Sequence, residues 1–251
     1  MITDKTAIPL TKLFKIWLLA GAVMVLCLGL YEFITKTPIA ITSESITVYL
    51  IQGCIFSLAA FWALSTIGVY FRTAFNNSSA NIKNDLKLAL KYFFVYALAA
   101  VAFIGLIVLV AVILMKMGLF DMAAFNRSST AGSLRQPELT YLHDMVVGSP
   151  FKFVLYLFAT CILIPIEEEI FHRRLLYVSL RNKLPFLSSL LISSLIFGLG
   201  HMPAVSAISA FVVGLFLGWI YEKHQKLSVT IMVHGLINFS VTMVMLFLAI
   251  K

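Results

Sequence analysis

Long uninterrupted apolar stretches, separated by short polar segments, dominate the pattern of the chain. A helix needs about 20 consecutive apolar residues to cross a bilayer. Seven stretches qualify: 13–35, 46–71, 88–115, 152–180, 185–202, 204–222 and 227–250. In hydrocarbon only helices or closed barrels satisfy every backbone amide, and these stretches are too long for barrel strands. The pattern therefore predicts an all-α, polytopic bundle of about seven transmembrane helices.

The segment 118–150 interrupts this pattern. It combines charged residues with Gly132, Pro137 and the hydroxyl run Ser128–Thr130. We expect an extramembrane loop with an amphipathic piece, or a re-entrant segment; a further crossing there would make eight helices. The chain then divides into three regions. They are a three-span membrane region over 1–117, this segment over 118–150, and a helical core over 151–251.

Composition excludes the soluble globular class. Of 251 residues, 61% are hydrophobic and only 12% are charged, whereas soluble domains average roughly 25% charged residues. No globular protein of this length has an interior that could hide so much apolar surface. The three cysteines, Cys27, Cys54 and Cys161, lie inside apolar stretches without CxxC spacing. They are typical of core residues and not of a disulfide or metal framework.

Charge distribution predicts the orientation. The net charge is +8, and the basic residues stand in short segments between apolar stretches. With the N-terminus inside, 13 of the 19 Lys and Arg residues fall on the inner side and 6 on the outer side. This bias follows the positive-inside rule and predicts a cytoplasmic N-terminus. It indicates a lipid bilayer as partner and argues against nucleic acid. The compact size favours a prokaryotic plasma membrane.

Charged residues stand inside the stretch 152–180, where each isolated charge costs about 2.5–3.5 kcal/mol. They are Glu167, Glu168, Glu169, His172, Arg173 and Arg174. Such a cluster must pair internally or face a polar cavity. Residues four apart share a helix face, so we expect Glu169 to meet Arg173 and Glu168 to meet His172. Arg174 needs a partner of its own, either Glu167 or the cytoplasmic headgroups.

Two later stretches add His201, and His234 with Asn238 four residues on. A carboxylate and a histidine together can deprotonate a water, and the Asn238 amide can stabilise an oxyanion. Glu168, His201 and His234 also match the His₂Glu ligand set of catalytic zinc sites. Neither HExxH nor Gly-x-Ser-x-Gly occurs in the sequence. Hydrolysis by activated water is therefore favoured, with the metal-free and zinc-bound versions both open.

The order of these residues resembles the CAAX protease and bacteriocin-processing family, the Abi-type intramembrane endopeptidases, which include type II CAAX prenyl endopeptidases. That family carries EExxxR, FxxxH and HxxxN on successive helices. Here the motifs are Glu168-Glu169-Ile-Phe-His-Arg173, Phe197-Gly-Leu-Gly-His201 and His234-Gly-Leu-Ile-Asn238. Two positions depart from the family's usual pattern, because His172 replaces an aromatic residue and Arg174 a small one.

The resemblance implies an intramembrane endopeptidase acting on a membrane-associated peptide or protein, lipidated or membrane-embedded. It implies that Glu168 and His201 activate the water, while His234 and Asn238 bind the scissile carbonyl and its oxyanion. Glu169 would act beside them. The supporting residues are Arg173, which would brace the helix or orient substrate, and Phe197. No cofactor is required by these roles, and a divalent zinc ion on Glu168, His201 and His234 is the alternative.

Two other classes of function compete with this prediction. A protein of the same fold could act without cleavage as a membrane scaffold, a regulator or a bacteriocin-immunity protein. A transporter could use the Glu and His residues as proton relays, but the sequence has no inverted repeat of the kind that transporters carry. Glu168→Gln separates the first two classes, because only an enzyme loses its function on that isosteric change.

Overall fold

The structure, a computed structural model, describes residues 6–36, 46–69, 82–121, 131–201 and 204–250. Within these ranges the secondary structure is helical and no strand occurs, which confirms the all-α prediction. The long helices before the site are α1 (Leu10–Thr35), α2 (Ile46–Ser65), α4 (Ile82–Lys116) and α6 (Ala131–Gly148). The site region contains α7 (Pro150–Phe158), the π-helical turn η1 (Ala159–Leu163), α8 (Ile164–Glu169), the π-helical segment η2 (Ile170–Tyr177), α9 (Val178–Arg181), α10 (Phe186–Leu199), α11 (Ala204–His224) and α12 (Leu227–Ile250).

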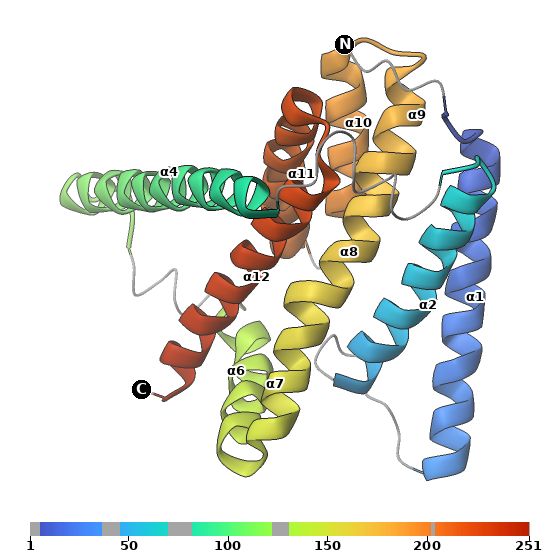
Figure 1. Ribbon diagram of the computed structural model, residues 1–251. Helices are drawn as coiled ribbons and strands as arrows, with labels where there is room; N and C mark the ends of the chain where they lie inside the picture. Colours follow the sequence, from blue (N-terminus) through green and yellow to red (C-terminus); the bar gives the residue numbers. More distant parts are fainter. Residues whose placement is uncertain (1–5, 37–45, 70–81, 122–130, 202–203, 251) are drawn as a thin grey trace.

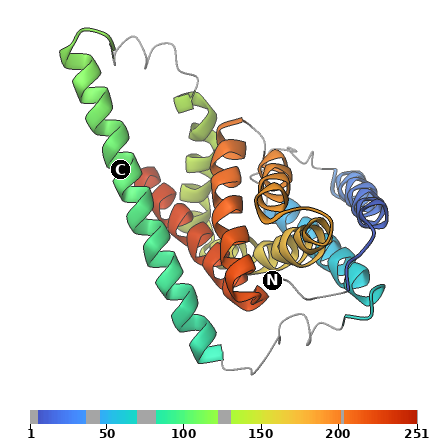
Figure 2. The same cartoon turned by 90° about the horizontal axis from the view of Figure 1, so that it is seen from above.

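The continuous helical run 150–181, from α7 to α9, forms the centre of the molecule; we call it the central run. Helices α1 and α2 lie along one side of it, and α10, α11 and α12 along the other (Figures 1 and 2). Helix α4 stands at the far side from α1 in both views and runs across the direction of the other long helices in Figure 1. The central run therefore lies between these two groups of helices (Figures 1 and 2).

Among the described residues, five helices are long and apolar enough to cross a membrane: Leu10–Thr35, Ile46–Ser65, Ile82–Lys116, Val205–His224 and Leu227–Ile250. Helix α10 is apolar but shorter, and the central run carries the charged cluster. The expected count of seven or eight crossings is thus supported for five helices only. The segment 118–150, expected as a loop or re-entrant piece, contains α6, and its residues 122–130 lie outside the described ranges. Residues 70–71 and 202, predicted as helix ends, also lie outside them.

Aromatic stacking joins the N-terminal helices to the central run. The indole of Trp17 on α1 stacks on the ring of Phe171, with centroids 3.8 Å apart, and also contacts Phe56 on α2. On the other side, α10 and α11 pack backbone against backbone. A Cβ added at Gly198 would lie 2.7 Å from the carbonyl oxygen of Ala207. The two contacts fix helices on either side of the charged cluster.

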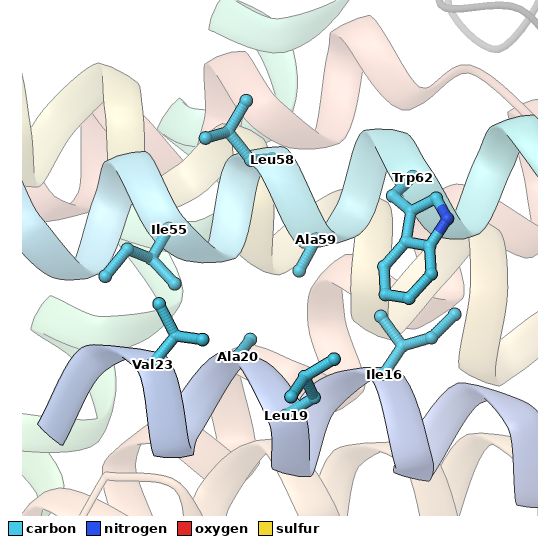
Figure 3. Close-up of a pocket in the computed structure, with 8 residues that line it drawn as sticks. All are labelled: Ile16, Leu19, Ala20, Val23, Ile55, Leu58, Ala59 and Trp62. Carbon is cyan, nitrogen blue, oxygen red and sulfur yellow. The ribbon is translucent and has the colours of Figure 1, made fainter. Parts of the chain in front are cut away.

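An apolar groove of about 300 Å³ lies between α1 and α2 (Figure 3). Its lining residues are Ile16, Leu19, Ala20, Val23, Ile55, Leu58, Ala59 and Trp62. No ionisable side chain lines the groove. A surface of this composition suits hydrocarbon and not water.

Candidate active site

Two π-helical segments flank the three glutamates in the central run. At the first, the Ile164 N–H donates to the carbonyl of Ala159, five residues back. Pro165 follows and has no N–H to continue the ladder. At the second, all eight residues of η2 are buried. Such π segments are rare and are frequent at functional sites. The carboxylates thus stand on one short α-helical piece, α8, between two local changes of helical register.

The three carboxylates take three directions, as the turn of about 100° per residue requires. Glu167 is 3% exposed and hydrogen-bonds to Gln52 on α2. Glu169 is fully buried and accepts the Nε–H of Arg173 at 2.9 Å. The predicted pairing of Glu169 with Arg173 is therefore confirmed. Glu168 is left to face the two later histidines.

Both histidines present Nε2 to Glu168. His201 Nε2 lies 3.6 Å from Oε1 of Glu168, and His234 Nε2 lies 3.6 Å from Oε2. Each ring is held from behind through Nδ1. The His201 Nδ1 donates to the carbonyl of Phe197 at 2.8 Å, and the His234 Nδ1 lies 3.2 Å from Oε1 of Glu169. A histidine whose Nδ1–H is held in this way has a fixed ring orientation and a fixed tautomer.

These contacts leave a gap that needs a hydrogen-bond donor. With Nδ1 protonated, a neutral imidazole offers only the lone pair of Nε2, and a carboxylate offers only acceptors. A separation of 3.6 Å is too long for a direct hydrogen bond. The Oε2 atom of Glu168 is buried and has no hydrogen-bond partner among the described residues. Polar contacts of this length are commonly bridged by a water.

The ring of Phe197 packs against the charged cluster. It is 1% exposed, and the guanidinium carbon of Arg173 lies 5.1 Å from its centroid. The rings of His172, His201 and His234 lie 4.9, 4.6 and 5.7 Å from the same centroid. The Nη1 and Nη2 atoms of Arg173 are buried without a hydrogen-bond partner in the described ranges. The aromatic face of Phe197 thus attracts the guanidinium of Arg173 where its Nη1 and Nη2 atoms lack hydrogen bonds.

Asn238 lies on the same face of α12 as His234, but its amide is engaged elsewhere. Its Nδ2 donates to the backbone carbonyl of Thr160, in η1, at 2.9 Å. The structure therefore brings together Glu168, Glu169, Arg173, Phe197, His201 and His234, and it joins Asn238 to the π-helical turn below them. The oxyanion role expected for Asn238 stays a prediction.

The two unusual positions of the first motif have separate surroundings. Arg174 donates to the backbone carbonyl of Thr6 at 3.3 Å and to its hydroxyl at 2.9 Å. Thr6, in the segment before α1, is thus a partner that the sequence, which offered Glu167 or the headgroups, did not predict. His172 packs edge-on against Phe171 and Phe197. Its Nδ1 is buried with no partner within the described chain, so the expected pairing with Glu168 does not include this atom.

Zinc on Glu168, His201 and His234 stays a prediction. In the described part of the chain, no three His, Cys, Asp or Glu side chains already lie as a metal-binding group. The donor set of Glu168, His201 and His234 has the right chemistry, and its atoms face one gap at separations of 3.6 Å. No step below depends on zinc.

Comparison with known families gives a match that covers the site. Residues 150–240 match the model of a family described as type II CAAX prenyl endopeptidase Rce1-like. That segment contains all three motifs. This region belongs to the CAAX protease family. Neither the curated proteins nor the solved structures give a match to the chain. The match to this protease family and the apolar helices together support an integral membrane protein and an enzyme.

Sequence reasoning missed two residues that hold this site together, Thr160 and Gly235. A Cβ at Gly235 would overlap the carbonyl oxygen of Cys161, so α12 approaches the central run here as only a glycine permits. The feature of the sequence that could have pointed to them is Pro165 inside an apolar stretch. A proline in a helix leaves carbonyls one turn earlier without donors, and these need partners from another helix.

Proposed function

We propose that the chain is an intramembrane endopeptidase that hydrolyses a peptide bond in a membrane-associated, lipidated polypeptide. The observation that carries the proposal is the gap between the Glu168 carboxylate and the Nε2 atoms of His201 and His234. A water in this gap donates its hydrogens to Glu168 and to Nε2 of His201 and keeps a lone pair for attack. The family described as a CAAX prenyl endopeptidase supports the class of substrate.

The reaction needs one proton to move twice. Glu168, oriented by its position between the histidines, takes a proton from the water while the water oxygen attacks the carbonyl carbon of the scissile bond. The resulting tetrahedral species collapses, the C–N bond breaks, and the leaving nitrogen takes that proton. General-base assistance of this kind contributes typically about 10²–10⁴-fold. His201 holds the water through Nε2, because its Nδ1 is committed to the Phe197 carbonyl.

His234 is assigned to the developing oxyanion. The carboxylate of Glu169 faces its Nδ1 at 3.2 Å, so that carboxylate can balance a positive charge on the ring. A doubly protonated ring presents an Nε2–H on the side of Glu168, where the carbonyl oxygen of the substrate develops negative charge. Donors fixed before the reaction stabilise such a charge without reorganisation. Glu169 and Arg173 are in this view the residues that orient His234.

Comparison of peptide termini tests the proposal without a known substrate. Cells carrying the wild type, Glu168→Gln and Glu32→Gln are compared for membrane and secreted peptide termini at matched expression. We expect termini present with wild type and with Glu32→Gln, a glutamate on α1 remote from the central run, and absent with Glu168→Gln. Identical termini in all three strains, with the cellular phenotype retained, would replace the enzyme by a non-catalytic membrane partner.

A defined substrate sharpens the same test. The purified full chain is incubated with a farnesylated peptide that ends in a CAAX sequence, and release of the C-terminal residues is followed by mass spectrometry. Glu168→Gln should lower the rate about 10²–10⁴-fold. Zinc content is measured on the same preparations. Near-stoichiometric zinc in active protein, lost on His234→Ala, would establish the metal-dependent version.

A further inference from the structure

Two neighbouring carbonyls of the central run lack a helical donor. In α-helical register the Thr160 carbonyl would accept from Ile164, and in π-helical register from Pro165. The Ile164 N–H donates to Ala159 instead, and proline has no N–H. The Cys161 carbonyl loses its α-helical donor for the same reason, since Pro165 stands four residues on. Buried carbonyls without a partner are costly.

Helix α12 covers both carbonyls. The Nδ2 of Asn238 donates to the Thr160 oxygen at 2.9 Å, and the backbone at Gly235 lies directly against the Cys161 oxygen. Gly235 and Asn238 are three residues apart, so they share one face of the helix. His234 precedes Gly235 and lies one turn before Asn238. The contact that covers the carbonyls therefore sits beside the histidine that faces Glu168.

We propose that Asn238 is a positioning residue, which together with Gly235 docks α12 on the π-helical turn and thereby sets His234 against Glu168 and Glu169. We call these contacts, Gly235 on Cys161 and Asn238 on Thr160, the α12 clamp. The catalytic consequence rests on the function proposed above. The clamp gives one N–H of the Asn238 amide a partner in the protein.

The geometry explains why the docking matters. A shift of α12 by one residue moves each side chain by 1.5 Å along the axis and turns it by about 100°. His234 would then lose its contact with Glu169 at 3.2 Å and its approach to Glu168 at 3.6 Å. A side chain at position 235 would force such a displacement, because the obstacle is backbone and cannot rotate away.

A double-mutant cycle between Asn238→Ala and Pro165→Ala tests the clamp. Alanine in place of Pro165 restores one N–H, which Thr160 would accept in π-helical register and Cys161 in α-helical register. The π-helical bond from Ile164 to Ala159 just before it favours Thr160. We expect Asn238→Ala alone to lower kcat about 10–100-fold, the usual size for a residue that orients a reacting group, with KM little changed. In the Pro165→Ala background the same substitution should cost at most about 3-fold. The substrate is the farnesylated CAAX peptide.

The result that would overturn the proposal is a loss of kcat from Asn238→Ala that does not depend on the residue at position 165. A donor to the oxyanion acts on the substrate, and an N–H restored at position 165 cannot replace it. An equal loss of kcat from Asn238→Ala in both backgrounds, with a smaller loss of unfolding temperature in the Pro165→Ala background, would therefore overturn the proposal and assign Asn238 to the oxyanion. The cycle is run in parallel on the unfolding temperature in detergent. Asn238→Ala should lower it by roughly 2–8 °C in the wild-type background and by less with Pro165→Ala.

Gly235→Ala supplies a second measurement that leaves the amide of Asn238 in place. We expect it to lower both kcat and the unfolding temperature. Gly21→Ala is the matched control, because a Cβ at Gly21 on α1 meets nothing within 4 Å. Equal changes in kcat and unfolding temperature for Gly235→Ala and Gly21→Ala would show that α12 does not approach the central run closely at Gly235. The temperature cycle stays informative if the wild type cleaves nothing, so failure of the proposed function and failure of the clamp are told apart.

Discussion

Helix α4 and the central run are both long helices in this chain, and they differ in what surrounds them. Helix α4 has 35 residues, of which only Ala89 and Tyr92 are buried among those in its range. In the central run, the eight residues of η2 are all buried, including His172, Arg173 and Arg174. The more apolar helix is therefore the exposed one, and the helix with the charges is enclosed.

The contacts of the two helices explain the difference. Helix α4 is held at its start, where Asp85 accepts from Lys226 at 2.6 Å and from Ser228 at 2.5 Å, and Tyr92 meets His224 at 2.7 Å. Beyond this end its side chains suit hydrocarbon and need no protein partner. The central run carries groups that hydrocarbon cannot satisfy, so each requires a partner from another helix. Apolar sequence indicates exposure to lipid here, and charged sequence indicates the protein interior.

The largest expected effect comes from removing one member of the buried pair. Arg173→Met leaves the Glu169 carboxylate uncompensated at a fully buried position, which costs about 3–5 kcal/mol of unfolding free energy. The measurement is unfolding in detergent. Addition of Glu169→Gln to Arg173→Met should recover part of the loss, because the unpaired charge is then gone.

Arg181→Met is the matched control for this prediction. Its partner Glu222 accepts at 3.2 Å, and both side chains are about one-fifth exposed. Partly solvated pairs contribute about 1 kcal/mol or less. Equal losses from Arg173→Met and Arg181→Met would show that burial does not separate the central run from its surroundings, and the comparison would lose its basis.

Substitution of Phe197 by leucine has the next largest expected effect. It removes the ring face beneath Arg173, whose Nη atoms have no other partner in the described ranges, and the ring contacts of His201 and His234. We expect a loss of about 1–2 kcal/mol in unfolding free energy and a lower cleavage rate. Phe239→Leu on the exposed side of α12 should change neither. The same loss from both variants would contradict the supporting role of Phe197.

The part of the site that sequence could predict is the part encoded within one helix or one motif. The four-residue spacing of Glu169 and Arg173 predicts their pairing, which the structure confirms. The motif order predicts that Glu168 meets His201 and His234, and the three side chains do converge. The all-α architecture follows from apolar length alone. Each of these rests on helix periodicity or on the cost of charge in hydrocarbon, both of which are local properties.

The remaining features depend on contacts between helices that periodicity does not encode. The partner of Arg174 is Thr6, separated by most of the chain. The Nδ1 atom of His172 is buried with no partner in the described ranges, so it does not make the expected contact with Glu168. The length of α4 predicts a crossing, but its course across the other long helices (Figure 1) follows from where its first turns are held.

The smallest expected effect comes from the contacts between the start of α4 and the start of α12. Asp85→Asn weakens the attachment of α4 to Lys226 and Ser228, and Ser228 lies at the start of α12, fewer than two turns before His234. We expect faster hydrogen exchange in the first turns of α4, a loss of about 1 kcal/mol in unfolding free energy, and cleavage within about twofold of wild type. Asp144→Asn, at an exposed position on α6, should alter none of these. A tenfold loss of cleavage on Asp85→Asn would mean that α4 holds α12, and through it His234, in register. The exposed helix would then belong to the catalytic assembly.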